Sequence, residues 1–185
     1  PQVKLFEISV WKTDTAAEPH NLALGKPTAV DSYTGDLAGA NAVDGDNFSE
    51  DSRWMTAPFD PPVPHWLEID LQGQYYIDAV SFWTGYDGYN TPLADYRFQR
   101  QIPGGWEDIY VRTSNNESIV SFTFGPVLAS KVRLYTANTP QVKIYEIEVW
   151  EALMGPLVNT LDVYDTANAA DWSVEASLQS GLNQY

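Results

Sequence analysis

Short segments in which apolar and polar residues alternate run along most of the chain. The clearest lies at residues 140–151, PQVKIYEIEVWE, where a side-chain period of two predicts a strand buried on at least one face. The chain begins with a near copy of this segment, PQVKLFEISVWK at residues 1–12, and eight of the 12 positions are identical. Unless the similarity of two strands is due to chance, 140–151 closes a complete module and 1–12 closes a preceding, similar module.

Between the two copies, the same alternation predicts a series of short strands separated by turn residues. Strands of this length and spacing are typical of β-sandwiches and barrels. The expected strands cover residues 28–32, 65–71, 76–84, 95–101, 106–113, 119–124 and 130–136.

The two flanks of this series have different patterns. Residues 13–20, TDTAAEPH, are polar and contain a proline, which predicts a linker and places the complete module at 21–151. In residues 152–185 a Gly-Pro pair ends the strand pattern, and residues 172–179 then alternate again. We expect a linker followed by a lone strand, which either starts a following, different module or packs against the middle one.

Composition limits the partners of the chain. The formal net charge of −15 repels phosphate backbones and anionic lipid surfaces, so we expect no nucleic-acid partner. No apolar run is long enough to span a bilayer, so we expect no membrane insertion. The negative field attracts cations, among which calcium suits carboxylate oxygens. There is no cysteine, so core packing or a bound ion must hold the fold without disulfides.

Six short motifs follow one another along residues 21–151: NLALGKP (21–27), AVDGD (42–46), SRW (52–54), HWLEIDL (65–71), KVRLY (131–135) and IYEIEVW (144–150). In their order and spacing, they resemble the discoidin-like family. This family is also called the coagulation factor 5/8 type C domain and includes many family 32 carbohydrate-binding modules. The resemblance covers about residues 21–151 and implies an all-β, eight-stranded jelly-roll sandwich, the galactose-binding-domain-like fold, in which the terminal strands pair.

Residues 41–52 together with Glu146 give the strongest chemical signal. Calcium takes about six to eight oxygen ligands, and the sequence Asp44-Gly45-Asp46 predicts a turn that presents carbonyl oxygens. The resemblance implies a structural calcium ion between this turn and the closing strand. The implied ligands are the Asn41 and Asp46 carbonyls, the Asp44 carboxylate, the Ser52 hydroxyl and carbonyl, the Tyr145 carbonyl and the Glu146 carboxylate.

The sequence departs from the family pattern at one of these ligands. The family usually places a Ser or Thr five residues after the Asp, where this chain has Ser49, whereas Ser52 follows a three-residue insertion. The alternative to an ion site is an Asx turn beside a surface glutamate, with no ion bound.

Loops rich in Tyr, Asp and Asn are the candidate glycan contacts. Aromatic faces pack on the C–H surfaces of sugars, and planar polar groups hydrogen-bond to sugar hydroxyls. The alternative is that these are ordinary turn residues. The candidates are Tyr33 and Asp36 in loop 33–39, and Tyr86, Asp87, Tyr89 and Asn90 in loop 85–92, with Asn115 and Asn116 in a third loop.

Two positions in the sequence weaken a galactose interpretation. Galactose-binding relatives often carry a His after the Trp of the SRW motif and an Arg at the start of the loop that is 85–92 here. This chain has Met55 and Gly85-Tyr86 in those places, so another glycan, such as a plant or algal polysaccharide, fits equally well. Five tryptophans fall within strand patterns and are expected in the core, with Trp83 the nearest to a loop: Trp54, Trp66, Trp83, Trp106 and Trp150.

No catalytic motif appears in the sequence. Nucleophile-elbow, phosphate-binding and zinc-protease patterns are absent, and His20 and His65 are expected to be structural. Together with the absence of these motifs, the resemblance implies a non-catalytic, secreted, calcium-stabilised carbohydrate-binding module of bacterial type. Its partners would be a polysaccharide or oligosaccharide and neighbouring modules, among them a glycoside hydrolase or polysaccharide lyase. The alternative function is an architectural spacer or adhesion module that binds no glycan.

Overall fold

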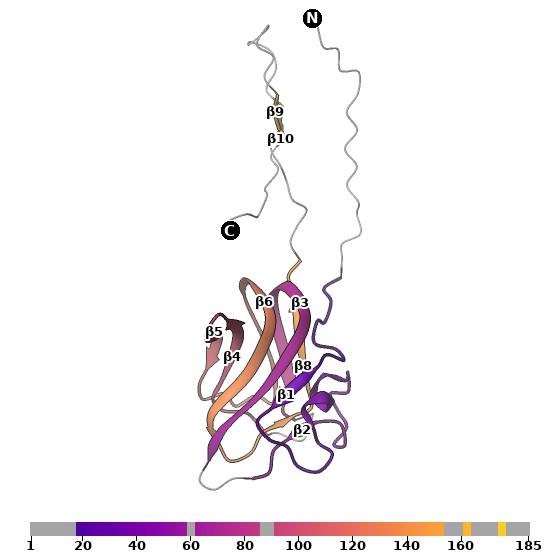
Figure 1. Ribbon diagram of the computed structural model, residues 1–185, viewed down its shortest axis with the longest axis vertical. Coiled ribbons are helices and arrows are strands. Elements are labelled where there is room, and N and C mark those ends of the chain that lie inside the picture. Colours follow the sequence, from indigo (N-terminus) through magenta and orange to yellow (C-terminus); the bar gives the residue numbers. More distant parts are fainter. Residues whose placement is uncertain (1–17, 59–61, 86–90, 154–160, 164–173, 177–185) are drawn as a thin grey trace, which may run out of the picture. The chain divides into compact units, whose positions relative to one another are not determined.

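A computed structural model describes residues 18–58, 62–85 and 91–153, together with the backbone of 161–163 and 174–176 (Figure 1). Contacts divide the chain into two compact units, Pro1–Ala152 and Leu153–Tyr185. Residues 1–12, which match the closing strand, lie outside the described residues. In the part of the chain that the structure describes, no helix is long and apolar enough to cross a membrane.

The first unit is built from β-strands with one short helical turn. Its elements are β1 (Thr28–Val30), the 3-10 helix η1 (Gly39–Val43), β2 (Trp54–Met55), β3 (Val63–Trp83), β4 (Tyr96–Ile102), β5 (Gly105–Arg112), β6 (Ile119–Thr139), β7 (Lys143–Ile144) and β8 (Glu146–Glu151). The main sheet has the order β1–β3–β6–β4–β5, and β8 also pairs with β3. The short strands β2 and β7 pair separately.

The strands β3 and β6 bend, and each contributes to two layers. The first half of β3 pairs with β1 and with the second half of β6, whereas its second half pairs with β8 and with the first half of β6. This gives a five-stranded layer, β1–β3–β6–β4–β5, opposite a three-stranded layer, β8–β3–β6. Counted by layer, the two long strands each appear twice, so the expected eight-stranded, all-β sandwich is confirmed.

The bend in β3 explains why sequence patterns predicted two strands there. The register with β6 shifts between Asp70 and Tyr75, and Gln72 has φ = 61°, a left-handed conformation that is uncommon outside glycine. Asp70 Oδ1 accepts a hydrogen bond from the backbone N–H of Gln72 at 2.9 Å, which holds the turn. The chain therefore passes from one layer to the other without a loop.

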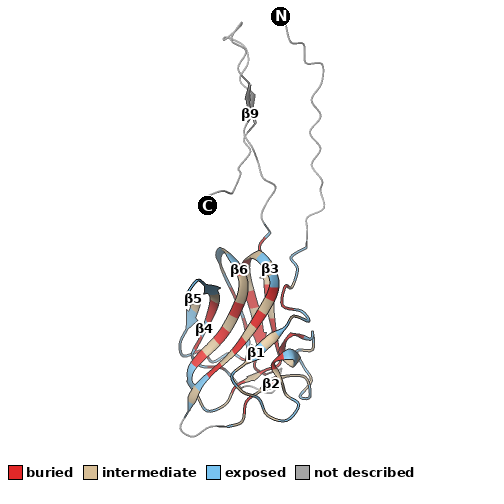
Figure 2. Cartoon of the chain, viewed as in Figure 1, coloured by how far each residue is buried: buried red, intermediate tan, exposed pale blue. Residues whose placement is uncertain are grey.

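The core lies between the two layers (Figure 2). Alternate residues of the first half of β3 are fully buried, and so are residues of β6 and β4 that face them. These residues are apolar and lie side by side on neighbouring strands, so they fill the space between the layers. Their burial fixes which face of each strand points outward. They include Leu67, Ile69, Leu71, Phe98, Val132 and Leu134.

The topology gathers the loops at one end of the sandwich. The start and end of β3, the start and end of β6, the starts of β4 and β8 and the end of β5 all lie at this end, as the ribbon shows (Figure 1). We call it the loop end; its described residues are 31–58, 62, 84–85, 91–95, 113–118 and 140–145. At the opposite end the backbone N–H of Glu151 donates to the carbonyl of His20 at 3.0 Å. The expected pairing of the terminal segments is therefore present.

The second unit contains two short strands. β10 (Val174–Ala176) pairs antiparallel with β9 (Leu161–Val163), in the register Glu175 to Asp162. The expectation of a lone strand near 172–179 is therefore wrong. Residues 161–163 lie in an acidic, turn-rich stretch without a clear period of two, so the sequence pattern gave no signal for the partner strand.

Candidate functional site

The carboxylate of Glu146 lies at the start of β8 and is almost completely buried. Only 1% of the surface of Glu146 is exposed. Its Oε2 accepts a hydrogen bond from the backbone N–H of Gly45 at 3.2 Å, whereas its Oε1 is buried without a hydrogen-bond partner among the described residues. Burial raises the pKa of Glu146 to about 8, and the neighbouring Asp44 carboxylate adds to the shift. A buried carboxylate with an unpaired oxygen is costly unless a cation or a proton compensates it.

The turn after η1 faces this carboxylate. Gly45 has φ = 90°, so the turn needs glycine, and the turn directs the Gly45 N–H toward β8. Asp44 uses one carboxylate oxygen to accept from the N–H of Asp46 at 2.9 Å, and its other oxygen accepts from the Ser52 hydroxyl. Ser52, rather than Ser49, thus contacts Asp44.

The remaining implied calcium ligands belong to the same neighbourhood. Tyr145 directly precedes Glu146 and is fully buried. Asn41 lies in η1, and its side-chain amide donates to the Asp36 carbonyl at 3.1 Å and to the Arg53 carbonyl at 3.4 Å. The Asp46 carboxylate accepts hydrogen bonds from the N–H groups of Phe48 and Ser49. The Asp46 group implied as an ion ligand is its backbone carbonyl, which these bonds do not involve.

The donor set fits a hard cation. It combines the two acidic side chains of Asp44 and Glu146 with a hydroxyl and backbone carbonyls, which is the oxygen chemistry that calcium prefers. Within the described residues, no three His, Cys, Asp or Glu side chains gather in a way that could hold a metal, so carbonyls would have to supply most of the ligands.

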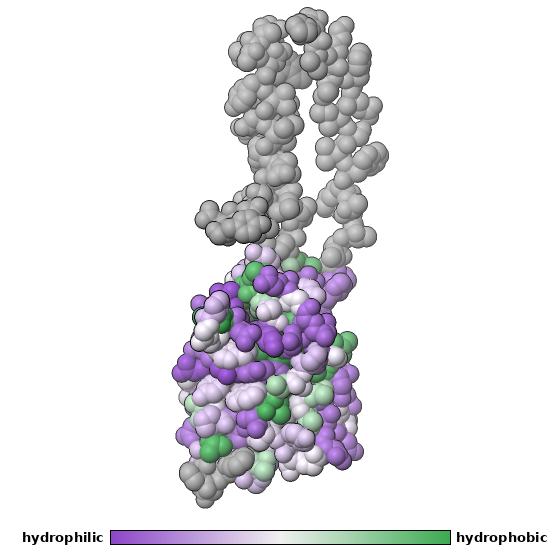
Figure 3. Space-filling view, viewed as in Figure 1, coloured by the Kyte–Doolittle hydropathy of each residue, from purple (hydrophilic) through white to green (hydrophobic). Residues whose placement is uncertain are grey.

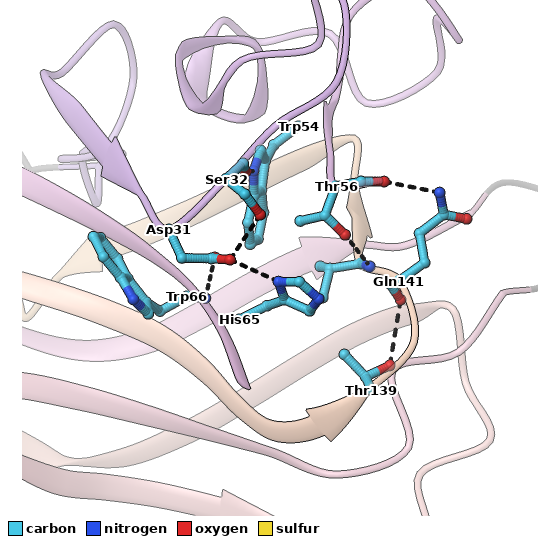
Figure 4. A network of polar contacts seen from close by, with 9 residues as sticks. Asp31, Ser32, Trp54, Thr56, His65, Trp66, Thr139 and Gln141 are labelled. Atoms are coloured by element: carbon cyan, nitrogen blue, oxygen red, sulfur yellow. Dashed lines mark hydrogen bonds and ion pairs between the residues drawn. The ribbon is translucent and has the colours of Figure 1, made fainter. Parts of the chain in front are cut away.

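A buried polar network forms the base of the loop end (Figure 4). Asp31 pairs through Oδ2 with Nδ1 of the fully buried His65 at 2.7 Å, and through Oδ1 with the backbone N–H of Trp66 at 2.8 Å. The Trp54 indole N–H donates to the Ser32 carbonyl at 2.8 Å. These bonds join the start of β3 to the segment that leads to Tyr33, so His65 has the structural role that the sequence suggested.

A second part of the same network joins β2 to the approach of the closing strand. The amide of Gln141 donates to the Thr56 carbonyl at 2.8 Å, and the hydroxyl of the buried Thr56 accepts from the N–H of Val142 at 3.1 Å. The loops at this end therefore rise from a rigid, hydrogen-bonded base.

Two of the predicted glycan contacts are exposed at the loop end. Tyr33 is 56% exposed, and Asp36 is also exposed in the same loop. The loop is held against β2, because the N–H of Thr34 donates to the Met55 carbonyl at 3.0 Å. The other four predicted contacts, Tyr86, Asp87, Tyr89 and Asn90, lie outside the described residues.

The base of loop 85–92 is nevertheless described. The N–H of Thr84 donates to the Ser118 carbonyl at 2.7 Å, and the N–H of Thr91 donates to the Ser118 hydroxyl at 2.8 Å. The Thr91 hydroxyl in turn donates to the Thr84 carbonyl. The loop therefore starts and ends at adjacent points on the loop end.

Two sequence-based expectations need correction. Asn115 is 4% exposed, and its amide donates to the carbonyls of Leu93 and Glu117, so it braces the loop and is not available to a ligand. Among the five tryptophans expected in the core, only Trp54 is fully buried. The other four are half-buried, and Trp66 and Trp106 lie on the outer face of the five-stranded layer; a period of two does not reveal which face of a strand meets the core.

Comparisons with known proteins identify related domains. Residues 41–134, just over half of the chain, match the model of an F5/8 type C family described as "NedA-like, galactose-binding domain". No curated protein sequence matches the chain. The similar solved structures described below are carbohydrate-binding or lectin domains.

Chitosan-binding module 2 of a chitosanase/glucanase from Paenibacillus sp. IK-5, solved with chitotriose, is 29% identical; the match covers 70% of this chain and 98% of that chain, with a TM-score of 0.58. The family 32 module of NanJ from C. perfringens, solved with galactose, is 16% identical over 72% of this chain and 98% of that chain, with a TM-score of 0.60. The lectin domain of lectinolysin, complexed with Lewis B antigen, is 22% identical over 72% and 97%, with a TM-score of 0.61. The last two likenesses show the fold alone.

Proposed function

The chain belongs to the NedA-like, galactose-binding domain family of F5/8 type C domains, and from this premise we propose that it is a non-catalytic carbohydrate-binding module that holds a glycan at its loop end. The observation that carries the proposal is Tyr33, an exposed aromatic ring beside Asp36 on a loop that is braced from below by the Asp31–His65 pair. An exposed ring on a rigid base packs against a sugar with little loss of conformational entropy.

The glycan we propose is a polysaccharide rather than free galactose. Met55 occupies the position at which galactose-binding relatives often carry a His. The chitosan-binding relative is also more similar in sequence, at 29% identity, than the galactose-bound one, at 16%. A chitosan-type polymer and plant or algal polysaccharides are therefore the first ligands to try.

We further propose that a calcium ion stabilises the module. Asp44, Ser52 and Glu146 would supply side-chain oxygens, and Asn41, Asp46, Ser52 and Tyr145 would supply carbonyls. The buried, unpaired Oε1 of Glu146 supports this proposal, because an ion would supply its missing partner. When bound, the ion would tie β8 to the turn after η1, as a disulfide would in a chain that contained cysteine.

The wider context that we propose is a secreted, multidomain protein of bacterial origin. The module would hold a polysaccharide-active domain close to its substrate and so raise the local substrate concentration. The next module in the chain would begin after Ala152.

Affinity electrophoresis in gels that contain single polysaccharides tests glycan binding. The native protein, Tyr33→Ala and a Tyr86→Ala, Tyr89→Ala double variant would run beside a Tyr76→Ala control. Tyr76 pairs with Leu128 and accepts the N–H of Ala152 at its carbonyl, so it lies at the end of the sandwich away from the loop end. We expect retardation by one class of polysaccharide, loss of it in the loop variants and retention in the control. If folded native protein is retarded by no polysaccharide, the module is a spacer.

A further inference from the structure

The outer face of the five-stranded layer carries an aromatic pair near the loop end. Pairing in register places Trp66 on β3 beside Tyr135 on β6, and Tyr135 beside Arg97 on β4. The residues on either side of each of these three along their strands are buried, so the three side chains point away from the core. Trp66 and Tyr135 are half-buried, and Arg97 is exposed.

A hollow lies in this face at the loop end, beside Tyr135. It has a volume of about 160 Å³, and its lining includes Arg97, Val111, Tyr135 and Ala137. Val111 pairs in register with Arg97, and Ala137 follows Tyr135 by two residues, so all four belong to the outer face. A cavity of about 150 Å³ accepts a benzene-sized ring, so this hollow has room for one six-membered sugar ring.

A second hollow lies in the same face, further from the loop end and toward β1. It has a volume of about 150 Å³, and its lining includes Pro27, Ala29, Glu68, Asp70 and Lys131. Ala29 pairs in register with Glu68, and Asp70 with Lys131. Ala29 is small and exposed, so the longer side chains around it leave a depression of the same size as the first.

The two hollows lie diagonally across β3 and β6. Tyr135 and Lys131 are four residues apart on β6, which is about 13 Å along the strand, and β4 and β3 are two strand spacings apart, which is about 10 Å. The hollows are therefore about 16 Å apart, which several linked sugar rings would span.

The surface between the hollows is held in place by side-chain contacts. The Arg133 guanidinium lies 5.2 Å from the centroid of the Tyr135 ring and 4.4 Å from that of Trp106. Its Nε donates a hydrogen bond to Oε1 of Gln99 at 2.8 Å. A surface that is already ordered binds a ligand with little loss of side-chain entropy.

The charges of this face are paired. The cations that point outward from β6 and β4 each have a carboxylate partner, which gives three ion pairs: Lys131 with Asp70 at 3.1 Å, Arg133 with Glu68 at 3.8 Å and Arg97 with Asp108 at 2.7 Å. These pairs cancel in a chain whose net charge is −15, so they attract neither an acidic nor a basic polymer. Fixed donors and acceptors side by side suit sugar hydroxyls, which both donate and accept.

We propose that this face binds the interior of an uncharged, linear polysaccharide, with one sugar ring in each hollow. The Tyr135 ring would pack on the sugar in the first hollow, and the sugars between the hollows would lie across Trp66 and the Arg133–Glu68 pair. Both hollows are depressions in a sheet face, so the polymer can continue past each of them.

The character of the surface favours a glycan over a protein partner. The visible face of the molecule, which β3 and β6 cross, is mostly hydrophilic with isolated apolar side chains (Figure 3). The inference rests on the proposed function in taking the ligand to be a polysaccharide, but it concerns residues outside the loops.

The test fills each hollow with an added side chain. Ala137→Trp and Ala29→Trp each place an indole at an exposed alanine of one hollow and remove no contact. Thr123→Trp is the matched control, because Thr123 is exposed on the same strand as Ala137 but on the outer face of the other layer, where it pairs with Ala79. Each variant is made in the native chain and in Tyr33→Ala, which removes the proposed loop contact.

Affinity electrophoresis compares uncharged polymers (hydroxyethyl cellulose, laminarin and galactomannan) with charged ones (chitosan and polygalacturonate). Calorimetry then compares a disaccharide with a hexasaccharide prepared from the polymer that binds. Amide NMR shifts on titration with the hexasaccharide locate the site independently of any variant.

We expect an uncharged polymer to retard the native chain, with little effect of added salt. The hexasaccharide should bind at least about tenfold more tightly than the disaccharide, also in Tyr33→Ala, because only the longer chain reaches both hollows. Ala137→Trp and Ala29→Trp should each weaken hexasaccharide binding about tenfold, and Thr123→Trp should not. The shifted amides should lie at 27–29, 66–70, 95–97 and 131–137.

Several results would overturn the inference, and they separate it from the proposed function. If Tyr33→Ala abolishes binding while the tryptophan variants at residues 29 and 137 bind normally, the loop site stands and the face site falls. The face site also falls if only charged polymers bind, if both oligosaccharides bind equally, or if Thr123→Trp weakens binding as much. If no glycan binds at all, both proposals fall.

Discussion

Glu146 on β8 and Gly45 in the turn after η1 are joined by a hydrogen bond of 3.2 Å across 101 residues of sequence, while the other oxygen of the Glu146 carboxylate is buried without a partner among the described residues. This pair is where the closing strand meets an early loop. A cation at the unpaired oxygen would strengthen that junction, so the binding of the proposed ion would be linked to the folding of this module.

Calcium is expected to stabilise the module. At a free calcium concentration of about 100 times Kd, mass action adds about 2.7 kcal/mol, which corresponds to a rise in Tm on the order of 8 °C for a module of this size. Thermal unfolding followed by circular dichroism with calcium and with a chelator measures the shift. Glu146→Gln should abolish it, whereas Glu148→Gln, on the same strand and half-buried, should keep it. An unchanged Tm in calcium, or an equal shift in both variants, would contradict an ion at Glu146.

Calcium is also expected to strengthen glycan binding, because Asn41 connects the two sites. Its backbone carbonyl is a proposed ion ligand, and its side-chain amide holds the Asp36 carbonyl of the glycan loop at 3.1 Å. We expect chelation to weaken glycan affinity about fivefold and the glycan to tighten calcium binding by the same factor. Calorimetric titrations of each ligand in the presence of the other measure both factors.

The Asn41→Ala variant separates coupling from ion binding. It keeps the backbone carbonyl and removes the side-chain amide, so calcium should still raise Tm. The factor by which each ligand changes the affinity for the other should fall toward one. Equal coupling in this variant and the native chain would show that another route connects the two sites.

The Asp31–His65 pair is expected to contribute strongly to stability. Asp31→Ala removes both the acceptor of the buried His65 ring and the acceptor of the Trp66 N–H, which should lower the free energy of unfolding by about 1–3 kcal/mol. Urea denaturation measures the change. Asp36→Asn is the control, because Asp36 is exposed, and a comparable loss in that variant would argue against the importance of the pair.

Acid should destabilise the module partly through Asp70. The N–H of Gln72, and then Lys131, lower the pKa of Asp70 below its ordinary value of 3.8. A lowered pKa means that the ionised group stabilises the folded state above the ordinary pKa and that this contribution is lost as pH falls through the lowered value. Asp70→Asn should therefore unfold at a lower urea concentration at pH 7 and lose less stability than the native chain between pH 5 and pH 2. Because Asp70 is exposed, the difference should be small; parallel pH profiles would refute it.

Strand patterns in the sequence were sufficient for the fold class, because a period of two fixes which residues share a face. They were not sufficient for the bend at Gln72, where a non-glycine residue takes a left-handed conformation that no pattern signals. The outward position of Trp66 and Trp106 was missed for a related reason. Apolar size suggested burial, but the opposite faces of these strands hold the core.

The candidate ion site shows a similar limit. The resemblance supplied Asp44 and Glu146, but the choice between Ser49 and Ser52 depended on the path of an insertion, which only coordinates define. Asn115 was a reasonable glycan contact by residue type, yet its amide is used by two carbonyls.

The pairing of His20 with Glu151 has a mechanical consequence. The polypeptide enters and leaves the sandwich at neighbouring points, on the side away from the loop end. A domain whose two ends lie side by side adds little length to the polypeptide. Inserting or removing such a domain therefore hardly changes the distance between the segments that precede and follow it. Tension applied along such a polypeptide would act on the junction between residues 20 and 151 and would spare the loops that we propose for glycan binding. Copies could therefore be multiplied to gain avidity without each copy stretching the path between its neighbours.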